Sequence, residues 1–249
     1  MPNVIGIIPA RYQSKRFPGK PLALLGGTPL IAIVYNAVLE SRLIDDVYVA
    51  TDDPRIESAV KQHGGKVIIT ASDHPTGSDR VAEAARRVPE AGVIVNIQGD
   101  EPFISGEIVD KVISELYDGD AVMSTACAPI TDPRAADDPN IVKVVLDNCG
   151  NALYFSRSRI PYTRKEGESA ARLYRHIGIY GFKKDFLLDY SNLKRTPLEM
   201  AEGLEQLRAL EHGYKIKTAI VEWDFPGIDT REDLIRAEAF LGERERRNG

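Results

Sequence analysis

The stretch NVIGIIPARYQSKRFPGKPL, residues 3–22, carries the pattern that decides the fold. Its run Val4–Ile8 is continuously apolar, as is typical of a strand buried on both faces of a parallel sheet. Similar runs recur at Val47–Thr51, Lys66–Thr70 and Val93–Ile97, with helical apolar spacing between them. This alternation predicts right-handed crossovers and a mostly parallel central sheet in an α/β, Rossmann-like fold. The helices are expected at Leu30–Ser41, Pro54–His63, Ser78–Arg87 and Ser105–Tyr117.

The loop after the first strand is rich in cations, which are Arg11, Lys15, Arg16 and Lys20. It leaves the carboxyl end of the strand, where open α/β sheets bind ligands. Clustered like charges repel one another unless an anion joins them, and several prolines stiffen the segment. We interpret the loop as a polyphosphate site held by side-chain cations and loop amides. A solvated basic loop is the alternative, because neither the GxxxxGKS/T nor the GxGxxG pattern is present.

After about residue 120 the strand–helix alternation weakens and the expected strands lie closer together. We interpret the chain as a single domain over residues 1–249, in which residues from about 120 to 200 form a smaller β-rich lobe. The expected elements of this second half are strands at Ala121–Ala128, Val142–Leu146, Ala152–Phe155, Leu173–Phe182 and Lys215–Val221, and helices at Pro197–His212 and Arg231–Leu241.

Composition and charge limit the class of protein. The 249 residues are 43% hydrophobic and 28% charged, with a formal net charge of −5. This balance is typical of a globular protein and argues against broad nucleic-acid binding. No apolar stretch approaches the roughly 20 residues of a membrane span, and the amino terminus lacks the pattern of a signal peptide. Cys127 and Cys149 lack metal-site spacing, which favours free thiols and a cytoplasmic protein.

Two acidic motifs complete the pattern. Asp100, in QGDEP at residues 98–102, directly follows an expected strand, so it should lie at the same sheet edge as the cationic loop. An acid beside a polyphosphate is repelled unless a divalent cation bridges them, and Mg²⁺ takes few protein carboxylates. Asp100 could instead cap a turn. Asp229 or Thr230, in GIDTRED, could merely cap the last helix, with Asp233 as the capping-box partner.

Taken together, the motifs resemble one family. They are IIPARYQSKRFPGKPL (7–22), ATDD (50–53), HPTGSDR (74–80), VNIQGDEP (95–102), PNIVKVVLD (139–147), ALYFSRSRIPY (152–162), RHIGIYGF (175–182), LEQLR (204–208) and GIDTREDL (227–234). The chain resembles the 3-deoxy-manno-octulosonate (Kdo) cytidylyltransferases, also called CMP-Kdo synthetases, over about residues 4 to 241. The resemblance implies that CTP and Kdo give CMP-Kdo and pyrophosphate, for lipopolysaccharide biosynthesis.

The resemblance also implies roles for individual residues. Arg11 and Lys20 match triphosphate-binding cations, Ser78 and Arg80 fall in the segment around cytidine, and Asp100 with Asp229 matches the Mg²⁺ ligands. The four residues expected to act in catalysis are Arg11, Lys20, Asp100 and Asp229. The full nucleotide-binding set is Ala10, Arg11, Ser14, Arg16, Lys20, Ser78, Arg80, Gln98 and Asp100. The family commonly has Thr-Glu-Arg where this chain has Ser78-Asp79-Arg80.

The implied sugar pocket draws on the second half of the chain. Its residues are Gln98, Arg157, Arg164, His176, Tyr180, Glu205 and Gln206. His176 and Tyr180 are expected to face the same side of one strand, and Glu205 with Gln206 to project from a helix. The resemblance further implies a homodimer formed through the β-rich lobe. Two alternatives stay open. One is the same transfer to 8-amino-3,8-dideoxy-manno-octulosonate, against which Glu101 weighs, and the other is a nucleotide-binding regulator without catalysis.

Overall fold

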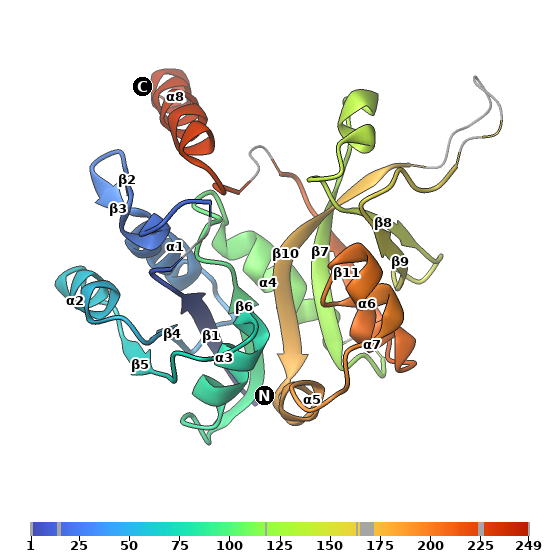
Figure 1. Ribbon diagram of the computed structural model, residues 1–249, viewed down its shortest axis with the longest axis horizontal. Coiled ribbons are helices and arrows are strands. Elements are labelled where there is room, and N and C mark those ends of the chain that lie inside the picture. Colours follow the sequence, from blue (N-terminus) through green and yellow to red (C-terminus); the bar gives the residue numbers. More distant parts are fainter. Residues whose placement is uncertain are drawn as a thin grey trace. The chain divides into compact units, whose positions relative to one another are not determined.

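The chain divides into two compact units in the computed structural model (Figure 1). Residues 2–13, 16–117, 119–162, 164, 172–223 and 227–248 are described. The first unit joins Met1–Asp110 to Asp224–Gly249, and the second is Lys111–Trp223. The second unit thus begins before, and ends after, the lobe predicted at about 120–200. The α/β class predicted from the sequence is confirmed.

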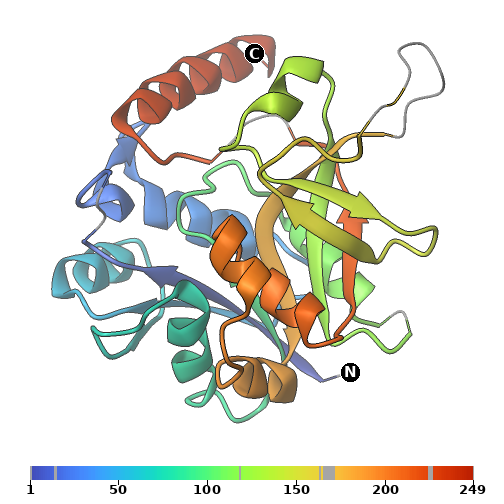
Figure 2. The same ribbon diagram turned by 45° about the vertical axis from the view of Figure 1, so that its right-hand side comes forward.

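The first unit contains a parallel sheet in the order β6–β1–β4–β5. Figures 1 and 2 show α1 and α2 on one side of these strands and α3 on the other. This arrangement follows from right-handed crossovers, because the chain moves outward from β1 through β4 to β5 and then returns from β5 to β6 on the opposite side of β1. The strands are β1 (Asn3–Ala10), β4 (Asp46–Thr51), β5 (Val67–Ile69) and β6 (Ala91–Ile97), and the helices between them are α1 (Leu30–Leu39), α2 (Pro54–Gln62) and α3 (Gly77–Ala85).

Local chemistry starts these helices where the sequence predicts them. Asp53 caps α2, because its carboxylate accepts from the backbone N–H of Arg55, and Pro54 occupies the first turn. Thr76 and Asp79 form a reciprocal capping box at the start of α3. The beginning of α3 is therefore fixed beside the carboxyl ends of the strands. The helix α4 (Gly106–Glu115) follows β6 in the chain.

A small apolar cluster anchors the cationic loop and the last helix of the first unit. The buried residues of the cluster are Phe17, Leu25, Leu30, Ile228 and Ala237. They come from the loop after β1, from the hairpin β2 (Leu24–Leu25) with β3 (Thr28–Pro29), from α1, from α8 (Arg231–Asn248) and from the segment that precedes α8. Packing thus joins the two ends of the sequence, although neither end shows this from its own pattern.

The second unit is built around β7 (Met123–Pro129). This strand pairs in parallel with β11 (Ile216–Ile220) and antiparallel with β10 (Tyr174–Lys183). The hairpin of β8 (Lys143–Leu146) and β9 (Ala152–Ser156) extends from β10. Its helices are α5 (Lys184–Tyr190), α6 (Pro197–Glu202) and α7 (Leu207–Glu211).

The prediction of one helix over residues 197–212 is wrong. Gly203 ends α6 in the left-handed conformation, with φ of 63°, which glycine adopts without steric cost. Glu205 and Gln206 therefore lie in the turn between two short helices. The helix α5 was not expected from the sequence.

Cys127 is buried and Cys149 exposed, both as free thiols. None of the described helices is long and apolar enough to cross a membrane.

Candidate active site

Three segments far apart in the sequence bring their charges together in the first unit. The ammonium nitrogen of Lys20 lies 2.5 Å from Asp100 Oδ2 and 3.2 Å from Asp229 Oδ1. Lys20 opens a short 3₁₀ turn after the cationic loop, Asp100 follows β6, and Asp229 precedes α8. We call these three residues the carboxylate–lysine cluster. The resemblance implied that Asp100 and Asp229 would share one Mg²⁺ shell. In the structure both carboxylates contact the ammonium of Lys20, and the shared metal shell stays a prediction.

The electrostatics of this cluster favour a charged lysine. Burial by itself lowers the pKa of Lys20, but its contacts with Asp100 and Asp229 outweigh burial and raise the pKa above its ordinary value. Arg16 adds a second cation, because its Nη2 lies 3.1 Å from Asp229 Oδ2. Asp229 is 46% exposed and Asp100 28% exposed, so solvent and ligands can reach both carboxylates.

The neighbours of Asp229 cap α8, so the alternative in which Asp229 itself is the helix cap is wrong. Thr230 and Asp233 form the capping box of α8, in which the Thr230 hydroxyl donates to Asp233 and accepts from the Asp233 backbone N–H. The side chain of Asp229 is left to contact Lys20 and Arg16. The backbone N–H of Ile228 donates to the carbonyl of Asp100 at 2.8 Å, which holds the two acidic segments side by side.

Arg11 and Arg80 lie near the start of α3 but are held differently. Arg11 donates to the carbonyl of Thr76 at 2.7 Å, and burial followed by repulsion from Arg80 lowers its pKa. Arg80 is fully buried, where it pairs with Asp52 at 2.7 Å and donates to the Thr70 hydroxyl at 2.6 Å. Its Nε is buried without a hydrogen-bond partner in the described part of the chain. Such an orphaned donor is costly unless a ligand satisfies it.

The remaining nucleotide candidates of the first unit have less informative surroundings. Ala10 is buried at the end of β1, and Ser78 is buried in the first turn of α3. The amide of Gln98 donates to Asn96 Oδ1 at 3.3 Å. Ser14 lies outside the described residues.

In the second unit, His176 and Tyr180 lie on the same side of β10, as expected, but much closer than a regular strand allows. Four residues of regular strand span about 13 Å. The ring centroids of the two side chains are only 5.4 Å apart, because the pairing of β10 with β7 shifts register between Ile177 and Tyr180. We call this pair, together with the opposed Thr125, the bulge cluster. Burial, then repulsion from Arg175, lowers the pKa of His176 to about 3, so the ring is neutral at pH 7.

Arg157 is oriented by backbone carbonyls. Its Nε donates to the carbonyl of Glu202 at 2.8 Å and its Nη1 to the carbonyl of Pro139 at 3.0 Å. The Glu202 carboxylate accepts from the Arg157 backbone N–H at 2.9 Å. Buried Lys143 donates to the Arg157 carbonyl at 2.5 Å. The end-on edge of the guanidinium, formed by Nη1 and Nη2, is therefore the edge that can fork onto a carboxylate.

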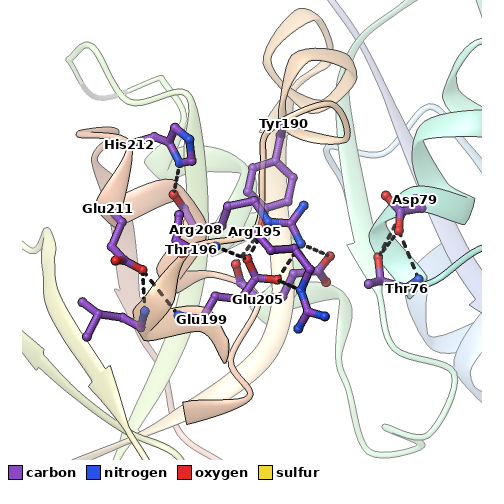
Figure 3. Close-up of polar contacts among 11 residues, drawn as sticks. Thr76, Asp79, Tyr190, Arg195, Thr196, Glu199, Glu205, Arg208, Glu211 and His212 are labelled. Carbon is purple, nitrogen blue, oxygen red and sulfur yellow. Dashed lines mark hydrogen bonds and ion pairs between the residues drawn. The ribbon is translucent and has the colours of Figure 1, made fainter. Parts of the chain in front are cut away.

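A buried ion pair supports the turn that carries Glu205 and Gln206 (Figure 3). Arg208 forks onto Glu199, with Nη2–Oε1 at 2.6 Å and Nε–Oε2 at 2.8 Å, and both side chains are almost fully buried. The hydroxyl of Tyr190 donates to the Glu205 carbonyl at 2.6 Å. These contacts fix the turn, and Gln206 is itself buried.

Sequence reasoning missed several residues that hold the candidate residues in place through hydrogen bonds and ion pairs. They are Thr125, Lys143, Glu199, Glu202 and Arg208. Only the charged pair in the LEQLR segment hinted at Arg208. The remaining sugar candidate, Arg164, is exposed and stands between residues that are not described.

Comparison with known proteins identifies the family. The family described as "Cytidylyltransferase" matches residues 5–216. The 3-deoxy-manno-octulosonate cytidylyltransferase of Phocaeicola vulgatus is 51% identical over 97% of this chain and 98% of its own length. The protein of that description from Acaryochloris marina is 45% identical over 96% of this chain and 97% of its own length.

The chain belongs to the cytidylyltransferase family. A solved CMP:2-keto-3-deoxy-manno-octonic acid synthetase complexed with CTP matches this cytidylyltransferase with a TM-score of 0.92 and 42% identity, over 97% of this chain and 99% of the other. A solved 4-diphosphocytidyl-2C-methyl-D-erythritol synthase from Anaerococcus prevotii shares the fold, with a TM-score of 0.65 over 96% of each chain, at 17% identity.

Proposed function

We propose that this cytidylyltransferase transfers cytidylate from CTP to 3-deoxy-manno-octulosonate, giving CMP-Kdo and pyrophosphate. The observation that carries the proposal is the carboxylate–lysine cluster, in a chain about half identical to relatives described as Kdo cytidylyltransferases. Two carboxylates and a lysine from three separate segments meet at one point, which would place metal ligands and a cation beside a bound triphosphate. A regulator that only binds nucleotide needs no such pair of carboxylates.

The residues of the chain act by position and charge. Lys20, Arg11 and Arg16 supply cations from one loop and would stabilise the charge that builds on pyrophosphate. The anomeric hydroxyl of the sugar attacks the α-phosphorus in line, without a covalent protein intermediate. The candidate site has no cysteine nucleophile, since burial raises the pKa of Cys127 to about 12.

Asp100 and Asp229 are the residues that would hold Mg²⁺. They fit the ion because both carboxylates already reach one cation, the ammonium of Lys20. The described residues contain no group of three or more metal-binding side chains, and Mg²⁺ typically pairs one or two carboxylates with phosphate and water. When bound, the ion polarises the α-phosphate and lowers the pKa of the attacking hydroxyl. Lys20 would then be released to pair with phosphate.

The sugar carboxylate is assigned to Arg157, whose end-on edge is rigid and always charged. His176, Tyr180, Glu205 and Gln206 would contact the sugar hydroxyls. Gln98 would lie where sugar and nucleotide meet. Arg164 is retained as a candidate from the resemblance alone.

The acceptor sugar is the point on which relatives differ. The 8-amino-3,8-dideoxy-manno-octulosonate cytidylyltransferase of Shewanella pealeana is 46% identical over 96% of this chain and 98% of its own length. Overall identity therefore does not separate the two sugars. The resemblance favours Kdo through Glu101, since it implies that some relatives have QGDQP where this chain has QGDEP.

Release of pyrophosphate is the direct test. The purified protein is given CTP and Mg²⁺ with Kdo, with 8-amino-3,8-dideoxy-manno-octulosonate, or with no sugar. We expect turnover with Kdo and a clearly lower kcat/KM with the amino sugar. The reverse preference would move the proposal to the amino sugar, and CTP binding without turnover on either would favour the regulator.

We also propose that the protein forms a homodimer through its second unit. Leu153 on β9 is 61% exposed and Ile220 on β11 is 49% exposed, and both line a cavity of about 550 Å³ with Val145 and Tyr174. A symmetric dimer is the commonest way to cover such a surface. Sedimentation equilibrium at micromolar concentration should give twice the chain mass of 27.5 kDa, and a monomer mass would contradict the proposal.

A further inference from the structure

The strand β10 contains an irregularity that brings His176 and Tyr180 together. His176 and Ile177 lie opposite Cys127 and Ala126, but the next partner on β7, Thr125, lies opposite Tyr180. Two residues of β10 are thus inserted against β7. A β-bulge of this kind leaves ladder groups without their usual partners.

The hydroxyl of Thr125 fills this gap. Its Oγ1 lies 2.8 Å from the carbonyl oxygen of Ile179 and 3.3 Å from that of Ile177. The third neighbour is the Nε2 of His176, at 2.9 Å. A threonine hydroxyl has one proton to donate and two lone pairs with which to accept.

These contacts decide which way each hydrogen bond runs. Carbonyl oxygens only accept, so the single Thr125 proton is directed to the Ile179 carbonyl, the nearer of the two. Toward His176 the Thr125 oxygen must then accept, and Nε2 must carry the imidazole proton. The neutral ring has no second proton, so its Nδ1 keeps a free lone pair.

We propose that Thr125 is a positioning residue that holds His176 as the neutral Nε2–H tautomer, with Nδ1 presented to accept a hydrogen bond from a hydroxyl of the acidic sugar. This inference rests on the proposed function for the identity of the sugar, but not for the tautomer. The Thr125 contact engages the Nε2 side of the ring, so Nδ1 is the nitrogen left to a ligand.

The surroundings of the ring support a fixed neutral state. Phe155 meets the imidazole edge to face, with ring centroids 5.0 Å apart, and Tyr180 lies on another side. Burial raises the pKa of Tyr180, so the phenol stays protonated and neutral. The charged neighbour in the chain is Arg175, which opposes protonation of His176. His176 therefore accepts a hydrogen bond from a sugar hydroxyl and transfers no proton in the reaction.

The test reads the tautomer without substrate. Protein labelled with ¹⁵N-histidine is studied by long-range ¹H–¹⁵N correlation, in which Nε2–H and Nδ1–H rings give different patterns. The chain has 4 histidines, and His176→Gln assigns the signal. We expect an Nε2–H ring that does not titrate between pH 8 and pH 5. An Nδ1–H ring in the unaltered protein would overturn the proposal, whatever the enzyme proves to transfer.

Variants at Thr125 then connect the tautomer to sugar binding. Thr125→Val keeps the shape and removes the acceptor, so the Nε2–H preference should be lost and the KM for Kdo should rise about tenfold, with the Kd for CTP unchanged. Thr125→Ser should restore both properties. A tautomer that stays fixed in the valine variant would overturn the positioning role of Thr125, and a lost tautomer preference with an unchanged KM would overturn the sugar contact.

The neighbouring strand offers a matched control. Thr218 on β11 lies opposite Thr125 and is equally buried, but its Oγ1 has no hydrogen-bond partner in the described part of the chain. Thr218→Val makes the same chemical change one strand away. It should leave the His176 signal and the KM for Kdo unchanged. If it changed them as Thr125→Val does, the effect would belong to packing and the proposal would fail.

Discussion

The carboxylate–lysine cluster and the bulge cluster solve the problem of ligand recognition in opposite ways. The first gathers formal charges that neutralise one another, with Lys20 between Asp100 and Asp229. The second contains neutral groups whose hydrogen-bonding directions are set by irregular backbone. Charges can exchange partners when a metal or phosphate arrives, whereas a fixed tautomer serves one arrangement of hydroxyls. The comparison indicates that the first cluster should control turnover and the second should control the choice of sugar.

Removal of a carboxylate from the first cluster should have the largest effect. Asp100→Asn and Asp229→Asn should each lower kcat about 100-fold or more, because the site loses charge that acts in the transition state. Lys20 keeps a partner in each variant, so the urea midpoint should change little. Turnover is followed by pyrophosphate release in Mg²⁺.

Asp46→Asn is the matched control, because Asp46 begins β4 and pairs with exposed Lys66. It should leave kcat unchanged. Near-normal activity of Asp100→Asn or Asp229→Asn would remove that residue from the metal site, and the contrast between the clusters would fail.

The preference for CTP over UTP tests whether the first unit also recognises its ligand through fixed, buried hydrogen-bonding groups. Arg80 is held by Asp52 and Thr70 with its Nε unsatisfied. Both cytosine and uracil offer an O2 acceptor to Arg80, but only cytosine carries a 4-amino donor, which backbone carbonyls near Ala71–Ser78 would accept. Uracil would leave these carbonyls unpaired at a cost of about 1–3 kcal/mol, so kcat/KM should favour CTP over UTP by roughly one to two decades. Equal efficiency with both nucleotides, measured by pyrophosphate release, would contradict a cytosine pocket near Arg80.

Arg157→Lys keeps the positive charge of this side chain in the second unit but removes the two-pronged guanidinium group. Lysine cannot reproduce the hydrogen bonds to both Glu202 and Pro139 or approach a carboxylate end on. The KM for Kdo should rise about tenfold, with the Kd for CTP unchanged.

Arg159→Lys is the control, because Arg159 pairs with Asp137 at the surface. This variant should leave both the KM for Kdo and the Kd for CTP unchanged. Equal weakening of CTP by Arg157→Lys would show that the carboxylate of the sugar has another partner.

The smallest effect concerns the pH dependence of stability. The folded pKa of His176 is lowered from 6.5 to about 3. Above pH 6.5 the ring is neutral in both states, and its contribution to the free energy of unfolding is fully present. As the pH falls toward 3, the unfolded chain gains a proton that the native ring resists, and this contribution is lost.

Urea unfolding measures this loss directly. The difference in stability between the unaltered protein and His176→Gln should shrink between pH 7 and pH 5. A difference that stays constant would mean that the native ring titrates like a freely solvated histidine.

The sequence by itself determined the parallel sheet of the first unit and the residues of its cluster. Continuous apolar strands and capping signals are local, and Asp100 and the cationic loop directly follow strands whose carboxyl ends share one edge. Asp229 could be named only as one of two candidates, since a capping box and a metal ligand look alike in GIDTRED. The tertiary structure assigns the cap to Thr230 and Asp233 and leaves the Asp229 side chain to contact Lys20 and Arg16, while the metal role of Asp229 stays a prediction.

In the second unit, only the tertiary structure decided how the candidate residues are held. The sequence placed His176 and Tyr180 on one side of a strand, but the two inserted residues depend on Thr125, some fifty residues earlier. It made Glu205 and Gln206 helical, although Gly203 ends the helix and Arg208 with Tyr190 fixes the turn. Local patterns record apolar faces and caps, whereas register, tautomer and turn geometry depend on partners that are distant in the sequence.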